Sequence, residues 1–246
     1  MLKTSKDILV IGDSCRDIFI YCDATRMCPD VPVPILTCID IQENMGMAKN
    51  VQRNIMTSIS QCDIITNNNW YDITKTRYVH ASTNHMFFRI DSPESIDRIN
   101  LEDIDYNYKM IVISDYDKGF LSIEDIMTIL SKHNNVFIDT KKILGEWCEN
   151  AAYIKINHPE YLKSMPYICE KLKNKIIHTM GDKGCEFKNK RYNVKKVNIK
   201  DISGAGDSFL AALAISFLKS NSIERSIKFA NLKASEVVKY RGVSII

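Results

Sequence analysis

Short apolar runs that end in polar residues recur along this chain and predict buried strands. The first run occupies residues 8–11 and is closed by Gly12 and Asp13. Four similar runs follow, at residues 110–113, 136–138, 153–156 and 176–179. A continuous apolar run of this length is typical of a strand that is covered on both faces, as in a parallel sheet.

Helical patterns lie between these runs. Ser122 with Asp125 three residues later forms a capping box, which predicts a helix over residues 123–132. Further helices are expected at residues 165–172, 208–219 and 223–240. Because strands and helices alternate, the order predicts an α/β fold with a doubly wound, mainly parallel sheet flanked by helices.

Two segments break this alternation, at residues 32–41 and 76–91. Both are rich in β-branched and aromatic residues, which favour strands over helices. Residues 76–91 also leave no space for a crossover helix between two strands. We therefore expect a small antiparallel β lid beside the main sheet.

The composition fits one ordinary globular domain spanning residues 1–246, because 45% of the residues are hydrophobic and 26% are charged. The 33 basic and 30 acidic residues are scattered, so the charge gives no reason to expect a nucleic acid or a membrane surface as partner. No apolar run is long enough to cross a bilayer, and residues 1–7 lack the apolar core of a signal peptide. The eight cysteines form no C-x-x-C pair, which favours a reduced, cytoplasmic protein.

The segment Gly204-Ala205-Gly206-Asp207 stands directly before an apolar-periodic helix. Its backbone N–H groups and the positive end of the helix dipole would converge on a volume that suits an anion. Asp207 could accept a proton from a hydroxyl that attacks a phosphoryl group, and we expect the helix N-terminus to lower the pKa of its carboxyl. The same residues also fit an ordinary strand-to-helix turn with an aspartate cap.

This turn is one of four motifs whose order along the chain resembles a known enzyme family. The motifs are Asp201-x-x-Gly204-Ala205-Gly206-Asp207, Asn157-His158-Pro159-Glu160, Gly12-Asp13-x-x-x-Asp17 and Gly46-x-Ala48-x-Asn50-Val51. Together they resemble the signatures of the ribokinase/PfkB family of carbohydrate kinases. The resemblance implies a ribokinase-like fold, ATP as the phosphate donor, Mg²⁺ as a cofactor and a small sugar or sugar phosphate as the acceptor.

The resemblance also implies roles for single residues. Asp207 would be the catalytic base, and Gly204, Ala205 and Gly206 would form the anion hole. The acceptor would be bound by Asp13, Asp17, Gly46, Asn50, Arg89 and Lys118. The nucleotide would be bound by Asn157, Thr179, Gly181, Gly184, Asp201 and Asn231, and Glu160 would hold Mg²⁺ directly or through water. On their own, Asp13 and Asp17 also fit routine turn positions, and Lys118 fits a solvated lysine.

Within the family, further segments resemble the kinases that phosphorylate D-glycero-D-manno-heptose 7-phosphate at the anomeric hydroxyl. These segments are Pro29-x-x-Pro32-Val33-Pro34, residues 73–77, residues 89–91, residues 114–119 and residues 229–231. The resemblance implies transfer of the γ-phosphate of ATP to that hydroxyl and a homodimer built on the lid.

The chain departs from the family pattern on the side that would face the sugar. Met47 stands where the family has a second glycine, and Lys49 where it has a small residue. The stretch between the helix that follows and the strand near Thr76 is also shorter than in the family. Two alternatives therefore remain, a kinase for another sugar or nucleoside and a trimmed homologue that binds a sugar phosphate without turnover.

Overall fold

The computed structural model describes residues 6–93 and 95–246, and its main element is an eight-stranded sheet. Across the sheet the strands are β12 (Lys190–Tyr192), β11 (Cys185–Phe187), β10 (Ile176–Thr179), β9 (Tyr153–Asn157), β8 (Val136–Thr140), β7 (Tyr108–Asp115), β1 (Lys6–Gly12) and β4 (Cys62–Ile65). The six strands from β10 to β4 run parallel, whereas β11 and β12 are antiparallel to their neighbours. All five strands predicted from apolar runs are present, and the mainly parallel α/β sheet is confirmed.

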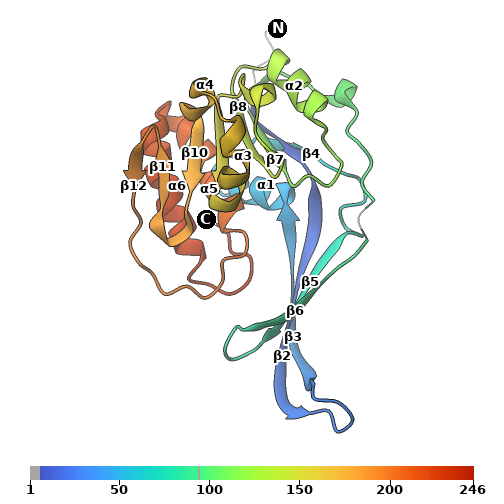
Figure 1. Cartoon of the computed structure of the whole chain (residues 1–246). Helices are drawn as coiled ribbons and strands as arrows, with labels where there is room; N and C mark the ends of the chain where they lie inside the picture. Colours follow the sequence, from blue (N-terminus) through green and yellow to red (C-terminus); the bar gives the residue numbers. More distant parts are fainter. Residues whose placement is uncertain (1–5, 94) are drawn as a thin grey trace.

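Helices cover both faces of this sheet (Figure 1). One face packs against α1 (Ala48–Met56), α5 (Ala205–Ser220) and α6 (Ile223–Val237), and the other against α2 (Ile123–Lys132) and its neighbours. In β1, Ile8 and Val10 belong to the first core, and Leu9 and Ile11 to the second. Because successive side chains of a strand point to opposite faces, burial of both faces explains why the strand sequences are continuously apolar.

The helix ends agree with their capping signals where these are strong. Ser122 and Asp125 form the expected capping box, and α2 has the predicted bounds. The helix expected at residues 165–172 is wrong, because the chain forms α3 (His158–Ser164), a 3-10 turn at Met165–Tyr167 and a short α4 (Glu170–Lys173). Pro166 lacks the backbone N–H that a continuation of α3 would need, so α3 ends at Ser164 and a 3-10 turn follows.

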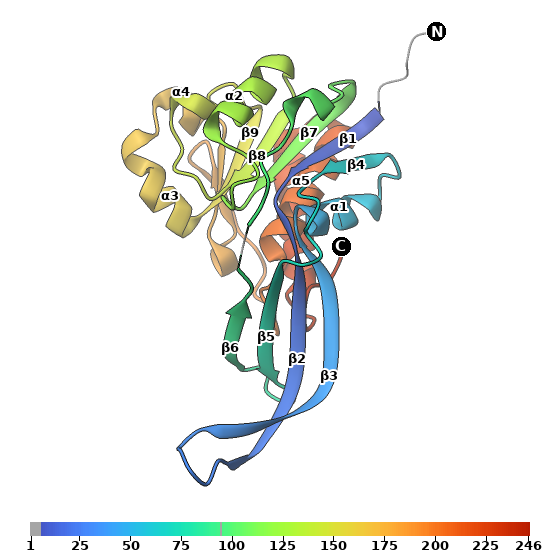
Figure 2. The same cartoon turned by 90° about the vertical axis from the view of Figure 1, so that its right-hand side faces the viewer.

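The lid is a second, four-stranded sheet in the order β3 (Pro34–Met47), β2 (Ser14–Met27), β5 (Thr74–His80) and β6 (Met86–Asp91). Its strands extend away from the main sheet in both views (Figures 1 and 2). The expected antiparallel pairing holds for β2 with β3 and for β5 with β6, but the lid is a mixed sheet, because β2 runs parallel to β5. The expectation missed β2, a strand of 14 residues whose charged positions interrupt its apolar pattern.

The chain enters and leaves the lid at one place. Asp13 alone separates β1 from β2, and Met47 ends β3 directly before α1. The two crossings are joined by a hydrogen bond of 2.9 Å from the Ala48 backbone N–H to the Asp13 carbonyl. This junction places the base of the lid at the carboxyl ends of β1 and β7, the edge where open α/β sheets bind ligands.

Among the described residues, no helix has the length and apolar character of a membrane span.

Candidate active site

Asp207 lies in the first turn of α5 and is almost completely buried, with 4% of its surface exposed. Gly204 precedes the helix in the left-handed conformation, with φ of 74°, so the backbone turns into Ala205 and Gly206 without a side-chain clash. Asn50 Nδ2 donates a hydrogen bond to one carboxylate oxygen of Asp207 at 2.9 Å. The Tyr116 hydroxyl donates to the other oxygen at 2.6 Å.

Burial raises the pKa of Asp207 to about 6, although the hydrogen bonds from Asn50 and Tyr116 act in the opposite direction. The expectation that the helix N-terminus would lower this pKa is therefore wrong. The cost of removing this carboxylate from water outweighs the effect of the two hydrogen bonds on its pKa. A carboxyl with this pKa is ionised at neutral pH but is more basic than an exposed aspartate, which suits a general base.

Asp13 is buried at the junction of the main sheet and the lid. Its carboxylate accepts hydrogen bonds from the backbone N–H of Tyr116 at 2.6 Å and of Phe120 at 3.4 Å. Burial, followed by the charge of Asp115, raises the pKa of Asp13 to about 6. Asp13 thus anchors the loop after β7.

Asp17 of β2 and Gly46 of β3 lie close together at the base of the lid, where Gly46 pairs with Cys15 and Asp17 with Asn44. Asp17 forms an ion pair with Arg77 of β5. A Cβ atom on Gly46 would lie 2.6 Å from a carboxylate oxygen of Asp17, so glycine is needed here for close packing. Met47, next in the chain, has φ of 58°, a conformation that a non-glycine residue rarely adopts.

The other two residues expected at the acceptor lie on other elements. Arg89 is on the edge strand β6, half exposed, and binds both carboxylate oxygens of Asp91 at 2.7 and 2.9 Å. Lys118 lies half-buried in the loop between β7 and α2. Hydrogen bonds link Asp13, Asn50 and Asp207, because Tyr116 bonds both carboxylates and Asn50 bonds Asp207.

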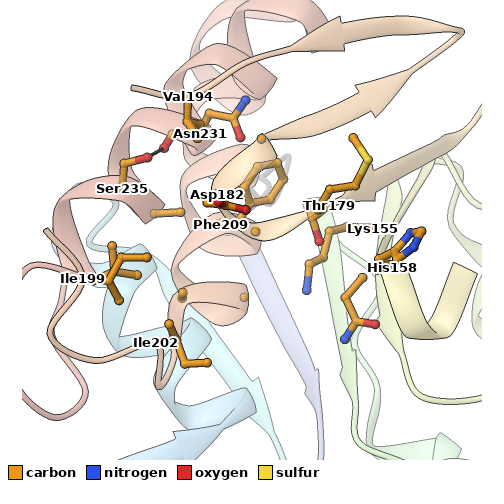
Figure 3. Close-up of a pocket in the computed structure, with 18 of the residues that line it drawn as sticks. Lys155, His158, Thr179, Asp182, Val194, Ile199, Ile202, Phe209, Asn231 and Ser235 are labelled. Carbon is orange, nitrogen blue, oxygen red and sulfur yellow. Dashed lines mark hydrogen bonds between the residues drawn. The ribbon is translucent and has the colours of Figure 1, made fainter. Parts of the chain in front are cut away.

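A pocket of about 780 Å³ opens beside the N-terminus of α5 (Figure 3). Its lining includes seven residues expected from the sequence, namely Asn157, Thr179, Gly181, Gly184, Ala205, Gly206 and Asn231. In Figure 3, Ile199 and Ile202 lie on one side of the pocket, and Lys155 and His158 lie on the opposite side. An apolar wall that faces a wall carrying the Lys155 ammonium group fits a nucleotide, whose base is flat and whose phosphates are anionic.

Asp201 is not among the described residues that line this pocket. Its carboxylate accepts hydrogen bonds from the backbone N–H of Ser203 at 2.9 Å and of Gly242 at 3.1 Å. It therefore ties the turn before α5 to the C-terminal segment.

Sequence reasoning missed three residues of this site, Tyr116, Asp139 and Lys155. Lys155 and Asp139 form a buried ion pair of 2.6 Å that lines the pocket. A Cβ atom on Gly206 would lie 3.1 Å from Lys155 Nζ, so the missing side chain leaves space for this ammonium group at the N-terminus of α5. The available signal was a lysine inside an otherwise apolar strand, Tyr-Ile-Lys-Ile at residues 153–156.

The residues present fit a Mg²⁺ ion that is bound together with nucleotide phosphates. Asp139 Oδ1 is buried and has no hydrogen-bond partner among the described residues, which leaves one oxygen ligand available. Glu160 is already engaged, because it caps α3 through Asn157 and pairs with Lys141. Within residues 6–93 and 95–246, no group of three His, Cys, Asp or Glu side chains could hold a metal alone. Mg²⁺ commonly uses one or two carboxylates, substrate phosphates and water.

Solved structures with a similar fold are sugar or nucleoside kinases by name. Ribokinase from Thermotoga maritima aligns with a TM-score of 0.72 at 18% identity, covering 97% of this chain and 94% of that chain. Phosphofructokinase-2 from Escherichia coli aligns with a TM-score of 0.69 at 12% identity, covering 98% and 95%. These similarities show a ribokinase-like fold.

The sequence pattern of the pfkB family carbohydrate kinases matches residues 38–246, and the chain belongs to this family. Among curated proteins, "Bifunctional protein HldE" of Helicobacter pylori strain J99 is 26% identical over 297 residues, covering 98% of this chain and 64% of that protein. HldE of Nitratiruptor sp. is also 26% identical, covering 94% of this chain and 61% of that protein. The chain thus spans less than two thirds of the length of these relatives. The expected kinase family is confirmed.

Proposed function

We propose that this protein transfers the γ-phosphate of ATP to the anomeric hydroxyl of D-glycero-D-manno-heptose 7-phosphate. The observation that carries the proposal is the buried carboxylate of Asp207, held at a helix N-terminus beside a nucleotide-sized pocket. A base with no chemical task would be a costly residue to bury, because burial disfavours its charged form.

In this mechanism ATP lies in the pocket with its base near Asn231 and its phosphates toward Gly206 and Lys155. The acceptor hydroxyl attacks the γ-phosphorus, its proton passes to Asp207, and the bond to the β-phosphate oxygen breaks to release ADP. The backbone N–H groups at the start of α5 and the Lys155 ammonium stabilise the charge on the transferred group. Asn50 orients the carboxylate that receives the proton.

Mg²⁺ would neutralise phosphate charge during the transfer. The unpartnered oxygen of Asp139 supports a direct or water-mediated contact to the ion. Glu160 supports the site through Lys141 and the start of α3.

A phosphate on the acceptor is supported by the inner face of the lid. Register places Lys75 beside Asp17 and Arg77 beside Arg89. Residues at these alternate positions project from the same face of the sheet. In this row the three cations, Lys75, Arg77 and Arg89, outnumber the two carboxylates, Asp17 and Asp91. The excess positive charge favours an anionic sugar over a neutral one.

A homodimer through the lid is supported by the outer face of the same sheet. Ile41, Ile20, Tyr78 and Phe88 lie side by side across its four strands. Ile41 and Phe88 are 55% and 46% exposed. A contiguous apolar sheet face of this kind is characteristic of a surface that another protein covers, and a second copy of the lid is apolar in the same place.

A cytoplasmic setting is part of the proposal. All eight cysteines are unpaired, although secreted proteins commonly pair them. ATP, the proposed donor, is a metabolite of the cell interior.

The deciding experiment measures ADP release with heptose 7-phosphate, unphosphorylated heptose, ribose and fructose 6-phosphate. A bidentate arginine contact to phosphate is worth roughly 1.5–3 kcal/mol, so kcat/KM should favour the phosphorylated heptose by about tenfold or more. Arg89→Ala should reduce this preference, whereas Arg26→Ala, which removes an exposed arginine near the far end of the lid, should not. Equal activity on free sugars would withdraw the heptose assignment, and no turnover on any sugar would favour a binding protein.

A further inference from the structure

Tyr116 connects the two buried carboxylates of the candidate site. Its backbone N–H donates to Asp13 at 2.6 Å, and its hydroxyl donates to Asp207 at 2.6 Å. Its side chain also lines the nucleotide pocket, where Lys141 Nζ lies 5.2 Å from the centre of its ring. One residue therefore contacts the acceptor side, the base and the nucleotide side.

The loop that carries Tyr116 is held in a defined conformation. Asp117 and Gly119 both have left-handed backbone angles, with φ of 58° and 100°. Lys142 Nζ binds Asp117 at 2.5 Å and Asp115 at 3.1 Å. These ion pairs, together with the anchor at Asp13, fix the position from which the Tyr116 hydroxyl reaches Asp207.

In this arrangement both carboxylate oxygens of the proposed base, Asp207, already accept hydrogen bonds. The hydroxyl of Tyr116 occupies one carboxylate oxygen of Asp207, and the amide of Asn50 occupies the other. A carboxylate can accept several hydrogen bonds, so an acceptor hydroxyl that donates to Asp13 shares it with the backbone N–H groups of Tyr116 and Phe120 and weakens their hold. A weaker anchor would loosen the loop and release Asp207 for the incoming hydroxyl.

We propose that Tyr116 is a positioning residue that couples acceptor binding at Asp13 to the availability of Asp207, and so suppresses hydrolysis of ATP by water. The inference rests on the proposed kinase function. In the suppressed reaction, a water oxygen attacks the γ-phosphorus, one water proton passes to Asp207, and ADP and inorganic phosphate leave. Productive transfer differs only in that the attacking oxygen belongs to the sugar.

The test is Tyr116→Phe, which keeps the ring and removes the hydroxyl. Release of inorganic phosphate from ATP without acceptor should rise by at least about tenfold, because a hydrogen bond to a charged group is worth roughly 1.5–3 kcal/mol. The acid limb of kcat/KM for the sugar should move to higher pH, since the lost hydrogen bond favoured the ionised carboxylate. A residue with a purely structural role would shift neither quantity.

Tyr106→Phe is the matched control, because the buried Tyr106 hydroxyl has no hydrogen-bond partner among the described residues. Asp13→Asn loosens the same loop from its other end and should also raise phosphate release, which keeps the test available if Tyr116→Phe does not fold. One outcome is that wild type phosphorylates a sugar, but both loop variants hydrolyse ATP as slowly as wild type and keep the same acid limb of kcat/KM. The coupling role of Tyr116 would then be overturned, while the kinase function would stand. If wild type phosphorylates no sugar, the proposed function fails and the coupling with it.

Discussion

At the residue scale, the chemistry of the candidate site depends on how much water each carboxylate keeps. Asp207 and Asp13 are buried and both have a pKa raised to about 6, chiefly by burial. Asp17, by contrast, is neutralised by Arg77 on the neighbouring strand. Local sequence gives the identity of these residues, but burial and ion pairing depend on segments that are distant in the chain.

Asp207→Asn should lower kcat by roughly a thousandfold, the range expected for loss of a general base, while ATP binding persists. Wild-type kcat/KM should fall as the pH drops below about 6, because Asp207 then becomes protonated. Steady-state ADP release across pH 5–9 and a nucleotide-binding titration check both points. Asp30→Asn, at an exposed position outside the pocket lining, is the control. Retention of more than about a tenth of wild-type turnover in Asp207→Asn would remove the base assignment.

Asp139→Asn should raise the Mg²⁺ concentration for half-maximal activity by about tenfold or more, because it replaces an anionic oxygen ligand with a neutral amide. Glu160→Gln should raise it less, since Glu160 is already paired with Lys141. Glu224→Gln, on the surface beside Lys190, is the control. The measurement is an Mg²⁺ titration at fixed ATP, and two unchanged titrations would place the ion elsewhere.

The sequence could predict the residues of the site that belong to recognisable motifs, such as Asn50 and Gly206. It did not reveal Tyr116 or Asp139, because each follows an apolar strand and fits an ordinary turn. Lys155 did leave a signal, because it is a lysine inside an otherwise apolar strand sequence, but the sequence does not show that its partner is the buried Asp139. Each of these residues takes part in the site through a contact with a residue far away in the sequence. An example is the 2.6 Å hydrogen bond from the Tyr116 hydroxyl to the Asp207 carboxylate.

At the element scale, the parallel strands could be predicted because both of their faces are buried. The lid strands carry charged residues among their apolar ones, and this mixture hid β2 from sequence reasoning. In β2 the apolar Ile18 and Ile20 lie on the outer face, whereas the inner face holds the buried Phe19 and Tyr21 together with Asp17. The parallel pairing of β2 with β5 has no local signal, because it depends on where the chain returns after β4.

Phe88→Glu should break the proposed lid dimer. Light scattering should give twice the chain mass of 28.2 kDa for wild type. In the variant, the dimer dissociation constant should rise by at least about a hundredfold, because burying an unpaired charge costs several kcal/mol. Tyr167→Glu, at an exposed aromatic outside the lid, should remain dimeric. A monomeric wild type at high concentration, or a stable Phe88→Glu dimer, would contradict the lid interface.

At the scale of the whole molecule, the buried carboxylates oppose stability while they serve the proposed reaction. The pKa of Asp207 is raised from 3.8 to about 6 on folding. Its contribution to stability is therefore fully present below pH 3.8 and is lost as the pH rises through 6. At pH 8 the native state holds a charge that the unfolded chain would solvate better, at a cost of roughly 3 kcal/mol.

Asp207→Asn should consequently raise the free energy of unfolding at pH 8, by up to about 3 kcal/mol, although it abolishes most turnover. The amide can still accept from Asn50, and the Tyr116 hydroxyl can reverse to accept from the new N–H group. The gain should shrink as the pH is lowered from 6 toward 4, because the wild-type carboxyl then becomes neutral in the folded protein. Urea unfolding at pH 8 and pH 4.5 checks the sign, with the exposed Asp30→Asn as control. An Asp207→Asn variant less stable than wild type at pH 8 would mean that the hydrogen bonds to Asp207 outweigh the cost of burying its charge.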